Sequence, residues 1–131
     1  MEDKDFTKCF VFHDMDWVQD ILHMSELGLW NMVTDKDMQN VKFYIDGTMA
    51  RLLGAKENMS PEACFEFWYK RINRGNHAYV NDVMNRIVHT GKLCEVQYTW
   101  NHPEWGDIPV RCAGRSRQLP DGRVLITGYH Q

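Results

Sequence analysis

Residues 92–131 constrain the fold most, because they predict three consecutive β-strands joined by short turns. The first run alternates between polar and apolar positions, and the apolar ones are Cys94, Val96, Tyr98 and Trp100. This period of two places the apolar side chains on one face of a strand. Pro and Gly interrupt the pattern at 101–107, a second run covers 108–119, and a Pro-Asp-Gly turn at 120–122 precedes a third run. Strands joined this closely form an antiparallel meander with one face to be covered.

The segment 47–91 predicts the helices that cover that face. Asp46 can cap a short helix that Gly54 ends, and Ser60-Pro61 starts a second helix that breaks at 73–76. Asn76 can cap a third helix, which Gly91 closes. The third helix has a clear apolar stripe with i, i+3, i+4 spacing, formed by Val80, Val83, Met84, Ile87 and Val88.

The N-terminal part predicts one more helix and two strands. Asp14 is a plausible N-cap for a helix whose apolar stripe is Trp17, Val18, Ile21 and Leu22. Strands are predicted at 28–34 and 41–45, with a loop at 35–40 between them. Strands segregated from helices in this order predict an α+β fold with the helices on one face of an antiparallel sheet.

Length and charge limit the classes of function. A chain of 131 residues predicts a single domain, and its net charge of −3 argues against nucleic acid as the main partner. No apolar run approaches the length of a membrane span. The four cysteines are scattered, which favours buried thiols in a reducing, cytoplasmic setting.

Five stretches in order resemble a PAS domain of the sensory-box subfamily with its C-terminal PAC-type strands. They are 27–32 (Leu-Gly-Leu-Trp-Asn-Met), 49–54 (Met-Ala-Arg-Leu-Leu-Gly), 79–91, 95–98 (Glu-Val-Gln-Tyr), and the closing hairpin from Asp121-Gly122-Arg123 to Gln131. The resemblance covers residues 25–131. One departure is Asn73-Arg74-Gly75-Asn76, where many relatives carry His-Pro-Asp-Asp.

The resemblance implies a five-stranded antiparallel sheet of order 2-1-5-4-3, with helices wrapped over one face around a small pocket. It implies a PAS domain at 27–131 and an N-terminal flanking segment at 1–26. Through residues 6–26, which include an apolar stretch at 6–12, such a domain is expected to form a homodimer. The chain stops directly after its last strand, which predicts an attached output domain after Gln131.

A pocket between sheet and helices is expected to be lined by Met, aromatic and aliphatic side chains, which suit a flat or oily ligand. The candidate ligand-binding residues are Trp30, Met32, Phe43, Met49, Leu53, Phe67, Ile72, Val83, Ile87, Val96 and Tyr98. The competing interpretation is that these residues fill the core and that the domain is a protein–protein interaction module without a ligand.

Other chemistries have weaker support in the sequence. Cys64 lacks the Asn and Gln neighbours that a flavin photosensor needs, so flavin is not expected, and no cofactor is required. His77 is the better candidate for a haem ligand, ahead of His89. A metal site at 102–107 is disfavoured because Pro103 and Gly106 predict a solvated turn. Tyr98 could serve a small enzyme, but no catalytic motif accompanies it.

The sequence therefore predicts a non-catalytic sensory or regulatory domain of a larger, bacterial signalling protein. The resemblance implies an output of the histidine kinase or diguanylate cyclase type. A change in ligand occupancy or at the dimer interface would favour one of two arrangements of the sheet and flanking helix.

Overall fold

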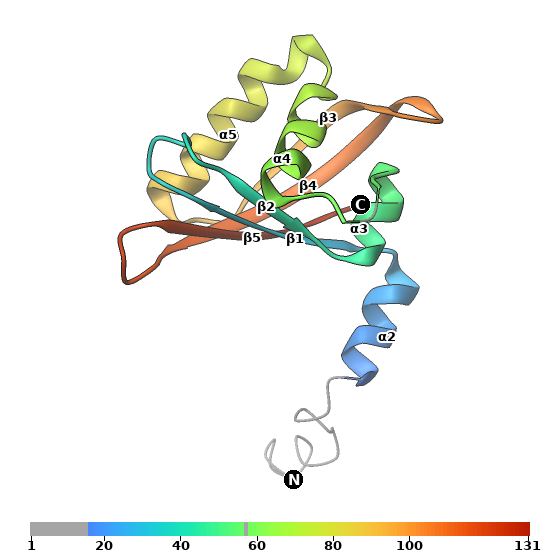
Figure 1. Ribbon diagram of the computed structural model, residues 1–131, viewed down its shortest axis with the longest axis horizontal. Coiled ribbons are helices and arrows are strands. Elements are labelled where there is room, and N and C mark those ends of the chain that lie inside the picture. The colour runs from blue at the N-terminus through green and yellow to red at the C-terminus, as the bar shows by residue number, and fades with distance from the viewer. Residues whose placement is uncertain (1–15, 57) are drawn as a thin grey trace, which may run out of the picture.

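In a computed structural model, residues 16–56 and 58–131 are described, and five antiparallel strands form one sheet (Figure 1). The order β2-β1-β5-β4-β3 confirms the predicted sheet order. The strands are β1 (Gly28–Thr34), β2 (Lys42–Ile45), β3 (Cys94–His102), β4 (Gly106–Gln118) and β5 (Val124–His130). Because β1 and β5 pair from Gly28↔His130 to Thr34↔Val124, the first and last strands lie side by side in the middle of the sheet.

The helices lie between the second and third strands, apart from one that precedes the sheet. They are α2 (Asp16–Ser25), α3 (Gly47–Leu53), α4 (Pro61–Lys70), the 3-10 helix η1 (Arg74–Asn76) and α5 (His77–Thr90). Figure 1 shows α4 and α5 covering the sheet, whereas α2 projects away from its opposite side. The predicted order of helices and strands is confirmed for the described residues.

The short helix α3 begins and ends at the predicted residues. The Asp46 carboxylate accepts a hydrogen bond from the Met49 amide at 2.8 Å, and it also accepts one from the Leu29 amide at 3.2 Å. Gly54 ends the helix in the left-handed conformation at φ 65°, which glycine adopts without a Cβ clash. Asp46 therefore joins the start of α3 to strand β1.

Helix α5 buries its predicted stripe, but the cap that we predict for it is wrong. Asn76 makes no side-chain capping bond. Its side-chain oxygen instead accepts a hydrogen bond from the Thr99 amide of β3 at 3.0 Å. The tertiary bond to the edge strand outcompetes the local cap, and it fixes the start of α5 against β3.

The hairpin between β3 and β4 is tighter than predicted. Strand β3 runs on through His102 and β4 begins at Gly106. His102 lies on the same inward face of β3 as Trp100 and Tyr98, and it is 3% exposed. The prediction of a solvated turn is therefore wrong for His102, because the alternating pattern of β3 continues for two more residues after Trp100 and so places His102 inward.

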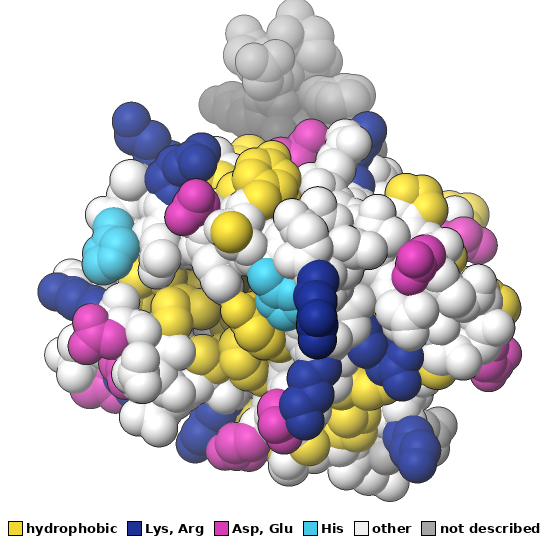
Figure 2. All heavy atoms as spheres, turned by 90° about the horizontal axis from the view of Figure 1, so that it is seen from above, with side chains coloured by type: hydrophobic (Ala, Val, Ile, Leu, Met, Phe, Trp, Pro, Cys, Tyr) yellow, Lys and Arg dark blue, Asp and Glu magenta, His cyan; other side chains and the backbone are white. Residues whose placement is uncertain are grey.

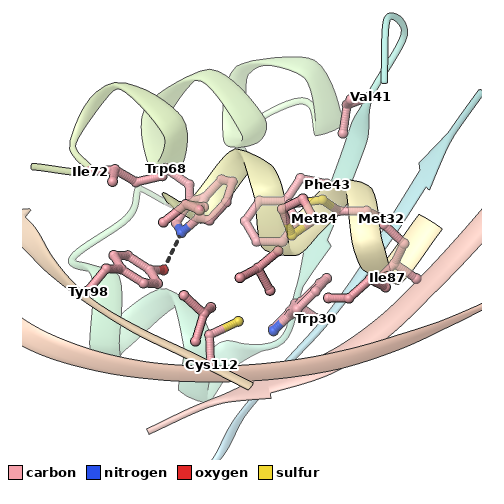
Figure 3. Close-up of a cluster of buried hydrophobic side chains, with 14 of the residues drawn as sticks. Trp30, Met32, Val41, Phe43, Trp68, Ile72, Met84, Ile87, Tyr98 and Cys112 are labelled. Atoms are coloured by element: carbon pink, nitrogen blue, oxygen red, sulfur yellow. Dashed lines mark hydrogen bonds between the residues drawn. The ribbon is translucent and has the colours of Figure 1, made fainter. Parts of the chain in front are cut away.

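One hydrophobic core fills the space between the helices and a single face of the sheet (Figure 3). All five strands contribute to it, and so do α3, α4 and α5. Its largest fully buried side chain is Trp100, whose indole N–H donates to the Trp68 carbonyl at 2.9 Å and so joins β3 to α4. This enclosed layer contains the candidate site.

Two N-terminal predictions lie outside the described residues: the Asp14 cap and the apolar stretch 6–12. Within the described ranges, no helix is long and apolar enough to cross a membrane.

Candidate functional site

The structure brings the predicted pocket residues together. With the exception of Phe67, all of them are buried in the one core cluster. Phe67 is half-buried at its rim, where its ring contacts Trp100 edge-to-face at 5.7 Å between centroids and the Arg71 guanidinium lies over it at 5.0 Å. Figure 3 shows Trp30, Phe43, Trp68 and Met84 directed into the same space from different elements.

A buried chain of hydrogen bonds crosses this interior. The Trp68 indole N–H donates to the Tyr98 hydroxyl at 2.7 Å, and the same hydroxyl lies 2.7 Å from His130 Nε2. These bonds join helix α4 to strand β3 and then to the last residue of β5. The chain links the helical layer to the point where the backbone leaves the sheet.

Sequence reasoning missed Trp68 and His130 as site residues. His130 is 2% exposed and lies on the inward face of β5. The signal that could have found it is the alternation of the last strand, where Val124 and Ile126 point inward and His130 follows the same period of two. Trp68 has a helical spacing that only indicates a core position, because its polar partner lies thirty residues away in sequence.

A second group of polar atoms lies beside the first. Cys112 of β4 pairs with His130 of β5 in the sheet register, so their side chains are neighbours on the inward face. Figure 3 shows the Trp30 indole nitrogen directed toward the Cys112 sulfur. The Trp30 ring also contacts the His130 ring edge-to-face at 6.3 Å. Trp30, Cys112 and His130 thus form one cluster on three adjacent strands.

Two nitrogens of this cluster have no nitrogen or oxygen partner among the described residues. They are Trp30 Nε1, beside which lies the weakly accepting Cys112 thiol, and His130 Nδ1. Buried polar nitrogens are nearly always paired, so each unpaired one calls for an explanation.

Burial sets the protonation of these groups. Desolvation lowers the pKa of His130 to about 3, so the ring is neutral at pH 7. Desolvation also raises the pKa of Tyr98 well above its usual value, an effect that the Trp68 hydrogen bond partly offsets. The pKa of the Cys112 thiol is raised by burial, and that of Cys64 on α4 is raised to about 11. These thiols are protonated and poorly nucleophilic.

A surface groove of about 400 Å³ leads toward this interior between the β1–β2 loop, α4 and α5. Its lining residues are Asp37, Met38, Phe65, Trp68, Tyr69, Asn81, Met84 and Asn85. Figure 2, which looks onto the helical side, shows hydrophobic side chains gathered around a hollow. Trp68 and Met84 belong both to the groove and to the buried core, so they separate the groove from the interior.

The predicted haem and metal candidates lie elsewhere. His77 is half-buried at the start of α5, where its ring contacts Tyr69 edge-to-face at 4.8 Å, and His89 is exposed. His102 Nδ1 accepts hydrogen bonds from the amides of Glu104 and Trp105. Among residues 16–56 and 58–131, no three His, Cys, Asp or Glu side chains gather in a way that could hold a metal ion.

Several solved structures resemble this chain. A sensory box histidine kinase/response regulator from Burkholderia thailandensis matches with a TM-score of 0.65 at 14% identity, over 87% of this chain and 82% of that chain. The N-terminal domain of a diguanylate cyclase with PAS/PAC sensor from Marinobacter aquaeolei matches with a TM-score of 0.59 at 18% identity, over 79% and 93%. The PAS-B domain of Drosophila melanogaster Cycle, with bound ethylene glycol, matches with a TM-score of 0.60 at 11% identity, over 78% and 97%.

No protein-family model and no curated protein sequence matches the chain. At identities this low, the likeness to solved structures shows the fold, and it confirms the fold that the sequence predicts.

Proposed function

We propose that this chain, which has the PAS fold, is a non-catalytic sensory domain of a larger signalling protein of the histidine kinase or diguanylate cyclase type. It binds a small molecule between its sheet and its helices and passes the change in occupancy to an attached output. Its similarity to domains of such signalling proteins supports this proposal. The unpaired thiols of Cys64, Cys94 and Cys112 favour a reducing, cytoplasmic setting.

The position of His130 is the observation that carries the proposal. Its side chain ends the interior chain of hydrogen bonds that begins at the groove residue Trp68. Its backbone pairs with Gly28, the first residue of β1, and His130 is itself the last residue of β5. A ligand that moves Trp68 or Tyr98 therefore acts directly on the two neighbouring strands through which the chain enters and leaves the sheet.

The flanking helix α2 is the proposed dimerisation element. It is the one described α-helix that contributes nothing to the buried core. Two of its apolar side chains are exposed, Ile21 at 49% and Met24 at 75%. A second copy of the chain would remove this apolar surface from water. An interaction module with a filled core is the second candidate, favoured by the dense packing of the predicted pocket residues.

Native mass spectrometry of the purified chain tests ligand and dimer together. We expect a dimer that carries additional mass from a small molecule, which is released when the protein is denatured. A chain that begins at residue 27 is expected to keep the ligand and to become a monomer, because it lacks α2.

The matched control is the full chain with Ile21→Lys and Met24→Lys, which alters the exposed side of α2 and leaves the interior unchanged. If no preparation carries mass beyond that of the polypeptide itself, the result would favour the interaction module without a ligand. A truncated chain that stays dimeric would contradict the role of α2.

A further inference from the structure

The interior cluster holds more hydrogen-bond donors than acceptors. Trp68, Tyr98 and His130 together carry three donor hydrogens on nitrogen or oxygen, yet only two hydrogen bonds join them. Trp30 adds a fourth donor, which lies beside the Cys112 sulfur, a weak acceptor. The excess is a property of the residue types, because each indole can only donate.

The excess persists for either tautomer of His130. When the Tyr98 hydroxyl donates to Nε2, the proton of His130 is on Nδ1, which has no partner. When Nε2 donates to Tyr98, the hydroxyl hydrogen has no acceptor left and Nδ1 is an unpaired acceptor as well. The first arrangement leaves fewer unpaired atoms. In both arrangements one buried donor of the Trp68–Tyr98–His130 chain remains unpaired, in addition to the Trp30 indole N–H.

The charge of the surroundings restricts what can use these donors. The buried polar side chains of the described chain are Thr34, Thr48, His102 and His130, and none of them carries a permanent charge. An anion in this interior would lack a buried cation and would lose its hydration, which is unfavourable. A cation would find no buried anionic side chain in the described chain to balance its charge. A neutral acceptor suits the cluster best.

The flexible side chain of Met49 lies next to the cluster. A Cβ on Gly28 would lie 2.9 Å from Met49 Sδ, and Gly28 pairs with His130 across the strands. Met84 lies between the groove and the core. Unbranched thioether side chains have several rotatable bonds and rearrange at little cost, so these two positions can admit a small molecule.

We propose that the interior binds a neutral, mostly apolar molecule through a hydrogen-bond-accepting oxygen of the carbonyl class. The oxygen is received by the Trp30 indole N–H and by the remaining donor of the Trp68–Tyr98–His130 chain. This inference rests on the proposed sensory function and names the class of ligand that the site takes.

Three probes of similar shape test the proposal on the full chain with ¹⁵N-labelled tryptophan. Acetophenone carries a carbonyl oxygen, ethylbenzene has a methylene in its place, and benzoate is an anionic acceptor. We expect acetophenone to bind about tenfold more tightly than ethylbenzene and to move the Trp30 indole proton to lower field, because it satisfies a buried donor. Benzoate is expected not to bind.

The indole of Trp100 is an internal control in the same spectrum, because its N–H already donates to the Trp68 carbonyl. Its proton is expected to shift much less than that of Trp30. In Trp30→Phe the preference for acetophenone over ethylbenzene should fall to about threefold or less, since one of two donors is lost. If that variant does not fold, comparing the indole proton shifts of Trp30 and Trp100 in the unaltered chain still tests the proposal.

Equal affinity for acetophenone and ethylbenzene, tighter binding of benzoate, or no binding of any probe would each overturn the proposal. These failures differ from failure of the sensory function. A co-purified ligand that is anionic or lacks an acceptor would leave the sensor in place and remove the carbonyl class. Selective acetophenone binding with no ligand and no dimer in native mass spectrometry would leave the site without the sensory role.

Discussion

Replacing Trp100 with alanine is expected to lower the free energy of unfolding by about 3–5 kcal/mol. The side chain is 0% exposed and is the largest fully buried one described. Its loss leaves a cavity between β3 and α4, and it also removes the donor that the Trp68 carbonyl accepts at 2.9 Å. Because the cavity and the lost hydrogen bond add, Trp100→Ala should destabilise more than most core substitutions.

Urea denaturation at pH 7 measures this effect, with Trp105→Ala as the matched control. Trp105 is 64% exposed and stacks on His102 with ring centroids 4.0 Å apart, so its loss should cost less than about 1 kcal/mol. A loss below 1 kcal/mol for Trp100→Ala would mean that β3 and α4 do not pack as described.

Replacing Gly128 with alanine should also destabilise the fold severely, by about 3 kcal/mol. Gly128 pairs with Trp30 on β1 and Gly114 on β4. A Cβ at this position would overlap the Ala113 carbonyl oxygen and the Trp30 ring. The carbonyl belongs to the β4 backbone and cannot withdraw without disturbing the ladder, and the ring lies in the closely packed interior.

Gly47→Ala is the control, because the nearest atom to its Cβ would be Arg51 Nη1 at 3.9 Å. Thermal unfolding should show Gly47→Ala within a few degrees of the unaltered chain and Gly128→Ala well below it. Equal melting temperatures would show that Trp30 does not lie over β5. The acetophenone site, which uses the Trp30 N–H, would lose its geometry as well.

Local rules predicted the elements of this fold because neighbouring residues carry the signals. The Asp46 cap, the Gly54 stop and the α5 stripe each depend on side chains within one or two helical turns. The resemblance to PAS domains added the sheet order, which no local rule determines. The Asn76 cap failed because a tertiary partner, the Thr99 amide, outcompeted the local bond.

The polar interior was harder to predict, because its bonds join residues that are distant in sequence. Trp68 and Tyr98 are separated by thirty positions, and Tyr98 and His130 by thirty-two. Their partnership depends on the register of β3, β4 and β5, which sequence patterns do not specify. His102 and His130 both continue an alternating run by one inward position, so their burial was predictable, although their partners were not.

The buried state of His130 has a consequence for stability at low pH. Burial lowers its pKa from 6.5 to about 3 in the folded protein. Between these values the unfolded chain binds a proton that the folded chain does not. The contribution of neutral His130 to the free energy of unfolding is therefore fully present above pH 6.5. On acidification it declines by about 1.4 kcal/mol per pH unit toward pH 3. His89→Gln, at an exposed position, should leave this pH dependence unchanged.

The most direct test of the enclosed, donor-rich interior is the ¹⁵N NMR titration of the His130 ring in the full chain. We expect the shifts of a neutral imidazole, protonated on Nδ1 and accepting at Nε2, to persist from pH 7 down to about pH 4.5. A titration midpoint near 6.5, the ordinary value for histidine, would place this ring in water and contradict the buried Trp68–Tyr98–His130 chain.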